Sequence, residues 1–147
     1  MKRAAFILAA FLPTAVLAGP DRASILLGTE HFNATEDFRE FNPGLFLTWE
    51  ENTFDYSVGI FQNSYSNVSV LASIGYDVEV ATEFEVGAFA ALALYPGEGD
   101  RFDHSIGDVV PLIGLKARYR NFFAQLIPSD GDTTDGILAV GLTFALD

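Results

Sequence analysis

The chain of 147 residues contains no cysteine and only 8 Lys or Arg residues, against 20 Asp or Glu residues. Without Cys, disulfides and thiolate metal sites are excluded. The net charge of −12 argues against binding to a phosphate backbone, because such binding needs clustered cations. We therefore expect no nucleic-acid partner. Beyond residue 19 the chain also lacks the run of about 20 apolar residues that a transmembrane helix needs.

Half of the residues are nevertheless hydrophobic. An acidic soluble domain of this length usually keeps its apolar residues to a core minority. The chain has the length of a single domain, so the sequence carries an apolar surplus that one water-soluble core does not account for.

The first 18 residues have the pattern of an export signal. Two cations near the start precede a short apolar run at 4–12, and residues 16–18 offer the small side chains of a cleavage site. The run is broken by a proline and is too short for a membrane anchor. We predict a cleaved signal peptide at 1–18 and a mature domain at 19–147.

The mature domain alternates apolar and small or polar residues with a period of two, which is typical of β-strands. The clearest example is 68–78, where one face consists of Val68, Val70, Ala72, Ile74, Tyr76 and Val78. The pattern predicts strands near 24–32, 44–51, 54–62, 67–78, 83–95, 109–118, 121–128 and 136–146. Helical periodicity is not prominent anywhere in this region.

Eight long strands with one fully apolar face predict an all-β fold, an eight-stranded antiparallel transmembrane β-barrel of the outer-membrane type. The alternative is a soluble barrel of the lipocalin kind, with its apolar face inward and a charged face outward. Here the second face is rich in Gly, Ser and other small residues, which suits a narrow lumen. We therefore favour the membrane barrel, located in the outer membrane and inserted by the barrel-assembly machinery.

Connection lengths agree with this topology. With the N-terminus at the inner side, the outer loops fall at 33–43, 63–66, 96–108 and 129–135, and three of them are longer than every inner turn. These loops are acidic, which suggests divalent cations bridging them to lipid phosphates, although plain solvated loops explain the acidity equally well. We predict no cofactor and no dedicated metal site.

The inward positions predict a lumen divided along its length. Charged residues toward the inner end form a plug of ion pairs, because buried charges need partners: Glu50, Asp55, Asp77, Glu83, Glu85, Lys116 and Arg118. The outer half is apolar and of acyl-chain width, and its predicted pocket residues are Phe46, Gly59, Phe61, Leu71, Phe89, Ala91, Ala93 and Leu112. Ordinary side-chain filling of the lumen is the alternative.

Two prolines interrupt the predicted strands. Pro111 and Pro128 each remove a donor from the hydrogen-bond ladder. In a closed barrel this opens the wall near the outer leaflet, so we predict a lateral gate there through which a lipid tail could pass. The alternative, a proline at a strand end marking the start of a loop, fits Pro128 better than Pro111.

Several short motifs, in order along residues 25–146, resemble the outer-membrane lipid A palmitoyltransferase family. They are Thr29-Glu-His31, Asn42-Pro-Gly44, Phe61-Gln-Asn-Ser-Tyr65, Val70-Leu-Ala-Ser-Ile-Gly-Tyr76 and Leu126-Ile-Pro128. The resemblance implies a barrel that holds a phospholipid acyl chain in its upper lumen and transfers the chain to lipid A. It implies membrane lipids as partners, and we expect a monomer.

By the same resemblance, the family's catalytic His, Asp and Ser correspond to His31, Asn63 and Ser64. The topology independently places His31 and Ser64 at one rim, above the apolar lumen. A rim His can act as general base on an acceptor hydroxyl. Asn63 departs from the family, because an amide can orient the imidazole but cannot offset its charge. The alternative function is a structural or lipid-binding barrel without the chemistry.

Overall fold

A computed structural model describes residues 18–129 and 133–147. Most of the predicted signal peptide, residues 1–17, lies outside this described part. The strands are β1 (Arg22–Phe32), β2 (Gly44–Glu51), β3 (Phe54–Gln62), β4 (Val68–Ala81), β5 (Phe84–Leu94), β6 (Val109–Tyr119), β7 (Phe122–Pro128) and β8 (Gly136–Ala145). One short 3-10 helix, η3 (Gly99–Arg101), lies between β5 and β6. No helix of the described part is long and apolar enough to cross a membrane.

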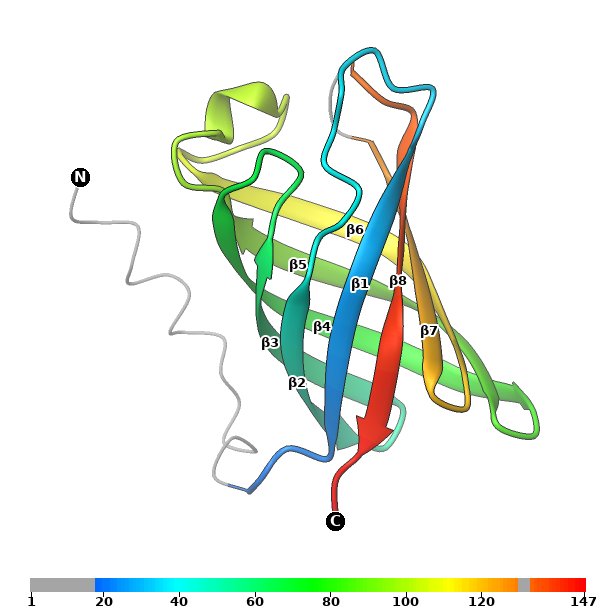
Figure 1. Ribbon diagram of the computed structural model, residues 1–147. Coiled ribbons are helices and arrows are strands. Elements are labelled where there is room, and N and C mark those ends of the chain that lie inside the picture. The colour runs from blue at the N-terminus through cyan, green and yellow to red at the C-terminus, as the bar shows by residue number, and fades with distance from the viewer. Residues whose placement is uncertain (1–17, 130–132) are drawn as a thin grey trace.

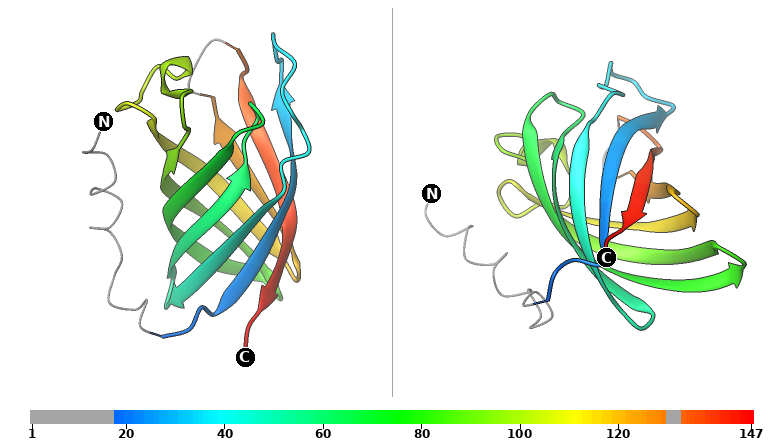
Figure 2. Two further views of the ribbon diagram at one scale, coloured as in Figure 1. Left: turned by 60° about the vertical axis from the view of Figure 1, so that its left-hand side comes forward. Right: turned by 60° about the horizontal axis from the view of Figure 1, so that its bottom comes forward.

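The eight strands form a closed antiparallel barrel in chain order, with β1 pairing with β8. The predicted eight-stranded barrel fold is therefore confirmed. Figure 1 shows β1 in blue beside β8 in red, and Figure 2 shows the strands tilted around a common axis. The upper end carries the loops at 33–43, 63–67 and 95–108, together with the described residues 129 and 133–135 between β7 and β8. The lower end carries the tight turns and the C-terminus.

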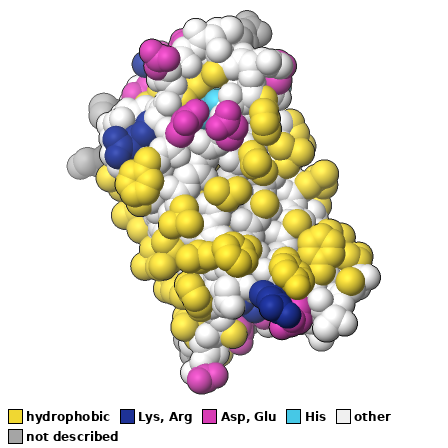
Figure 3. Space-filling view, turned by 45° about the vertical axis from the view of Figure 1, so that its right-hand side comes forward, with side chains coloured by type: hydrophobic (Ala, Val, Ile, Leu, Met, Phe, Trp, Pro, Cys, Tyr) yellow, Lys and Arg dark blue, Asp and Glu magenta, His cyan; other side chains and the backbone are white. Residues whose placement is uncertain are grey.

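The outer surface of the barrel is apolar. Seven of the eight strands contribute large exposed apolar side chains to this surface, including Ile25, Leu45, Ile60, Ile74, Ile113, Leu115, Leu126 and Val140. Figure 3 shows the apolar side chains around the middle of one face, with acidic side chains toward both ends. Because the opposite face of each strand points into the lumen, the arrangement is the reverse of a soluble barrel with a charged exterior.

Strand pairing is incomplete at two places in the upper wall. The β6–β7 ladder stops at Leu115 and Leu126, although both strands continue upward. The β1–β2 ladder stops at Leu26 and Gly44. Pro111 pairs with β5 across from Leu92, and Pro128 is the last residue of β7. The upper parts of β6 and β7 are therefore not joined by a backbone hydrogen-bond ladder.

Beside three luminal glycines, the space that a side chain would take is filled by a phenylalanine ring from the neighbouring strand. Gly59 lies directly opposite Phe46, Gly114 opposite Phe89 and Gly141 opposite Phe123. A Cβ at any of these glycines would overlap the facing ring. The absence of a side chain on one strand thus makes room for a ring from the next, so the rings fill part of the narrow lumen.

Candidate functional site

The local backbone of β1 decides which way His31 faces. A bulge between Leu26 and Gly28 adds one residue opposite β8, and such an insertion reverses the alternation beyond it. Leu26 and Thr29 consequently both line a cavity that runs along the lumen. His31 lines a second, smaller cavity at the upper end. Glu30 is left on the exposed outer side. Gly28 is needed there because a Cβ would lie 2.6 Å from the carbonyl oxygen of Glu40.

His31 and Ser64 meet at the upper rim. The His31 Nε2 atom lies 2.9 Å from the Ser64 hydroxyl oxygen, which is hydrogen-bonding distance. His31 comes from the end of β1 and Ser64 from the second loop, and only 8% of His31 is exposed. The structure therefore brings together two of the three predicted catalytic residues in a half-enclosed position.

The other ring nitrogen of His31, Nδ1, is buried and has no hydrogen-bond partner among the described residues. For Nε2 to accept a proton, the neutral ring must carry its own proton on Nδ1. The ring is held instead by stacking on Phe38 of the first loop, with centroids 4.3 Å apart and planes 14° apart.

Asn63 does not orient the imidazole, contrary to the prediction from the sequence. Its side-chain oxygen accepts hydrogen bonds from the backbone N–H groups of Tyr65 and Asn67, at 2.9 and 3.1 Å. Its amide nitrogen donates to the Ser69 hydroxyl at 2.9 Å, and the residue is 1% exposed. Asn63 therefore fixes the turn that presents Ser64, and it acts on the backbone instead of on His31.

The loops cover the upper rim with aromatic rings. Tyr65 packs edge-on against both Phe38 and Phe102, and Phe102 packs against Tyr95. Arg101 lies over the ring of Tyr65, 4.5 Å from its centroid. These rings roof a small cavity of about 50 Å³ that is also lined by His31, Ser64, Ile127 and Pro128. The His31–Ser64 pair thus shares a chamber with the upper end of β7.

A larger cavity of about 170 Å³ follows the lumen below this chamber. Five of the eight predicted pocket residues line it, namely Phe46, Phe61, Leu71, Phe89 and Leu112. The remaining three do not: Gly59 lies under the Phe46 ring, and Ala91 and Ala93 are buried. A cavity of this size is comparable to one that holds a benzene ring. Aromatic and aliphatic side chains line its upper part, and charged residues that include Glu50, Asp55 and Lys116 line its lower part.

The lower lumen contains a network of ion pairs that spans the barrel. Lys116 contacts both Asp55 and Asp77, and Arg118 contacts Glu85 and, at 3.6 Å, Glu50. Arg22, which the sequence analysis did not assign to this network, contacts Glu50 at 3.0 Å. Arg22 lies before the predicted start of the first strand, so the alternation of that strand does not assign its side chain to the lumen.

Glu83 is not part of this network, so its predicted place in the plug is wrong. It lies in the turn between β4 and β5 with a positive φ of 59°, and its carboxylate pairs with Arg120 at the surface.

A second layer of hydroxyl groups above the ions links Ser24 with Thr143 and Thr48 with Ser57, at 2.8 Å each.

Within residues 18–129 and 133–147, no group of three or more His, Asp or Glu side chains is arranged to hold a metal ion. What the described site places together is a hydroxyl and an imidazole, at the upper end of the luminal cavities. No protein-family model matches the chain, and no curated protein matches it.

Proposed function

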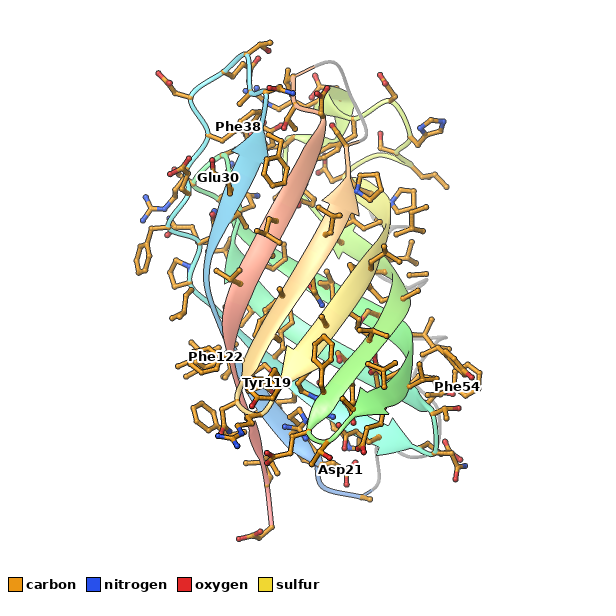
Figure 4. All side chains as sticks on the ribbon, turned by 90° about the vertical axis from the view of Figure 1, so that its right-hand side faces the viewer. Asp21, Glu30, Phe38, Phe54, Tyr119 and Phe122 are labelled. Carbon is orange, nitrogen blue, oxygen red and sulfur yellow. The ribbon has the colours of Figure 1, made fainter. Side chains whose placement is uncertain are left out.

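We propose that the mature chain is a β-barrel of the outer membrane. Its closed ladder and apolar exterior support this, because only a closed barrel or a helix satisfies its backbone groups in lipid. Aromatic residues near the lower end fit the interfacial belt of such proteins. Figure 4 shows Phe54, Tyr119 and Phe122 on the outside of the barrel at that level, and Phe54 packs edge-on against Tyr76.

We further infer that the barrel transfers an acyl chain from a phospholipid to lipid A. The hydrogen bond between His31 Nε2 and Ser64 Oγ, at 2.9 Å, is the observation that carries this inference. A hydroxyl that shares its proton with an imidazole is the usual arrangement for attack on an ester. The upper part of the cavity below is lined by apolar side chains such as Phe61, Leu71 and Leu112, which suits an acyl chain. The resemblance to lipid A palmitoyltransferases supports the choice of donor and acceptor.

The reaction proceeds in two half-steps. The Ser64 oxygen attacks the ester carbonyl carbon of the phospholipid while its proton passes to His31 Nε2. The ester C–O bond breaks, the departing lysophospholipid oxygen takes that proton, and the acyl chain remains on Ser64. A lipid A hydroxyl then gives its proton to His31 and attacks the acyl carbon, and the Ser64 oxygen recovers the proton.

The open wall between upper β6 and β7 gives lipid a route to the site. The ladder there ends at Leu115 and Leu126, and Ile127 and Pro128 line the chamber that contains His31 and Ser64. We propose Pro111 and Pro128 as the edges of this lateral gate. A lipid tail that passed between the two strands would reach the chamber without crossing the roof of aromatic rings.

The test is covalent labelling of Ser64. The mature protein, purified in detergent, is treated with a long-chain phosphonate ester and analysed by peptide mass spectrometry. We expect the label on Ser64, a loss of labelling by about 10²–10⁴-fold in His31→Ala, and no change in Ser66→Ala, which alters a nearby hydroxyl of the same loop. Equal labelling of wild type and His31→Ala would overturn the proposed chemistry.

One observation favours the second candidate, a barrel without enzymatic activity. The Phe46, Phe89 and Phe123 rings occupy space in the lumen, as they would in a structural barrel. Lipid A extracted from cells with and without the gene separates the two functions. An additional acyl chain that depends on both His31 and Ser64 supports the transferase, and an unchanged lipid A pattern supports the structural barrel.

A further inference from the structure

The loop between β5 and β6 folds as a compact unit above the ends of these two strands. We call residues 96–107 the cap, and Figure 1 shows it in yellow-green at the upper end of the barrel. It contains η3, and the Ser105 hydroxyl donates to the Gly99 carbonyl oxygen at 2.7 Å. Gly99 packs so closely on Gly107 that a Cβ would lie 1.9 Å from the Gly107 carbonyl oxygen. The cap therefore has its own internal contacts and can move as one body.

The backbone of the cap is bonded to itself and to its own stem. Among the described residues, each backbone hydrogen bond of the cap closes within 95–109. The first loop, by contrast, is joined by its backbone to the second loop, from the Arg39 N–H to the Ser64 carbonyl oxygen at 3.1 Å. It is also joined to the last loop, from the Thr35 N–H to the Thr133 carbonyl oxygen at 2.8 Å. The cap is thus the part of the rim that can be displaced without breaking a described backbone hydrogen bond to another loop.

Arg101 connects the cap to both of the other loops beside the chamber. Its guanidinium contacts Glu98 of the cap itself, Glu36 of the first loop at 3.9 Å, and the ring of Tyr65 in the second loop. The Glu98 carboxylate in turn accepts a hydrogen bond from the Asn67 amide at 3.0 Å. The Arg101 side chain is 47% exposed. Exposed ion pairs and cation–π contacts are individually weak, so this cluster holds the cap in place without fixing it permanently.

The chamber beneath the cap has too little room for a lipid ester. Its volume is about 50 Å³, and Ser64 and His31 line it. Arg101 and Phe102 of the cap form part of its wall. A cavity of about 150 Å³ is the size that holds a benzene molecule, whereas a glycerophospholipid brings an ester, a glycerol and a phosphate to the attacking hydroxyl. Part of the wall must therefore move before the ester can reach Ser64.

The barrel strands that line the chamber are poorly suited to such a movement. His31 and Ile127 are both paired with Ile137 of β8, and Leu112 is paired with β5. Displacing any of these residues would break hydrogen bonds of the closed ladder. Displacing the cap costs side-chain contacts such as those of Arg101. The cap is therefore the part of the wall that yields at the lowest cost.

We propose that the cap is a lid over the Ser64 chamber and that Arg101 is the side chain that holds it closed. The purpose of the lid rests on the proposed function, but its movement does not require turnover. The open lid admits the ester and glycerol groups of a lipid whose tail lies between β6 and β7. The closed lid keeps bulk water from His31 and Ser64. Because the contacts of Arg101 are ionic and exposed, salt weakens them and favours the open state.

The test measures how fast a thiol at position 64 is alkylated. The chain contains no cysteine, so Ser64→Cys gives the mature protein in detergent a single reactive thiol. Rates are measured with two uncharged reagents, N-ethylmaleimide and the larger N-cyclohexylmaleimide. Adding Arg101→Gln should speed both reactions by about three- to tenfold, through loss of the ion pairs and the cation–π contact. The larger reagent should gain more. Adding Glu36→Gln instead should give a smaller gain, because it removes only the contact with the first loop.

Salt dependence and a matched variant complete the experiment. Raising the salt concentration from about 0.05 to about 0.5 M should speed alkylation in Ser64→Cys, and should have little effect once Arg101→Gln is present. Arg120→Gln is the control, because Arg120 makes the same kinds of contact at the lower end, with the Glu83 carboxylate and the Tyr119 ring. It should leave both rates unchanged. Far-UV circular dichroism checks that each variant is folded.

Unchanged rates in Arg101→Gln, or an equal gain in Arg120→Gln, would overturn the proposal. A gain for the smaller reagent alone would overturn it as well, since the opening would then be too small for a lipid. His31 is present in every variant, so its effect on the thiol is common to all of them. If native Ser64 fails the phosphonate labelling test while the thiol at position 64 responds to Arg101→Gln, the acyl transfer is refuted and the lid is retained.

Discussion

At the scale of single residues, the site depends on a histidine that is oriented by stacking and by one hydroxyl. His31 contacts Ser64 through Nε2 and Phe38 through its ring face, while Nδ1 is buried without a described partner. The charge that appears when the ring takes a proton therefore has no hydrogen-bonded carboxylate to stabilise it.

A substitution at Asn63 tests whether its side chain reaches the His31 imidazole. Replacing it with Asp should not raise activity by pairing with His31, because the residue at this position faces Tyr65, Asn67 and Ser69. A buried carboxylate there should instead destabilise the second loop, by about 1–3 kcal/mol from loss of the Ser69 contact and desolvation. Urea unfolding in detergent measures the change. An increase in Ser64 labelling in Asn63→Asp would show that the side chain does reach the imidazole.

At the scale of elements, strand length and face were predictable, whereas local irregularities were not. A period of two and the spacing of turn residues identify a strand such as β3 within a residue. The bulge at Leu26–Gly28 carries no periodic signal, although a glycine inside a strand pattern is a weak indication of one. The roles of Asn63 and Glu83 depend on loop and turn geometry, which alternation does not describe.

The pairing of glycine with phenylalanine across strands makes a specific prediction. Gly59→Ala should cost about 1–3 kcal/mol of stability, because its Cβ overlaps the Phe46 ring and forces it from its position. Phe46→Ala should cost about 3–5 kcal/mol by creating a cavity. The double variant should be no less stable than Phe46→Ala alone, since the clash no longer exists. Strictly additive costs in the unfolding experiment would show that the ring does not lie on Gly59.

At the scale of the whole molecule, the apolar exterior has a direct consequence for handling. The mature protein should remain folded and monodisperse only in detergent or lipid, because an exposed apolar surface of this extent associates in water. Sedimentation and far-UV circular dichroism, with and without detergent, measure this. A monomeric, folded β-protein in plain buffer would contradict the membrane proposal.

The ion network of the lower lumen also bears on how the barrel assembles. Lys116 and Arg118 on β6 reach acidic residues on β2, β3 and β4, as well as on β5. Contacts with β2, β3 and β4 cross the lumen, so they form only after the sheet has curled to its final circumference. They stabilise the native state more than an open, partly paired transition state. The network should therefore slow the unfolding of the finished barrel and leave the rate of folding almost unchanged.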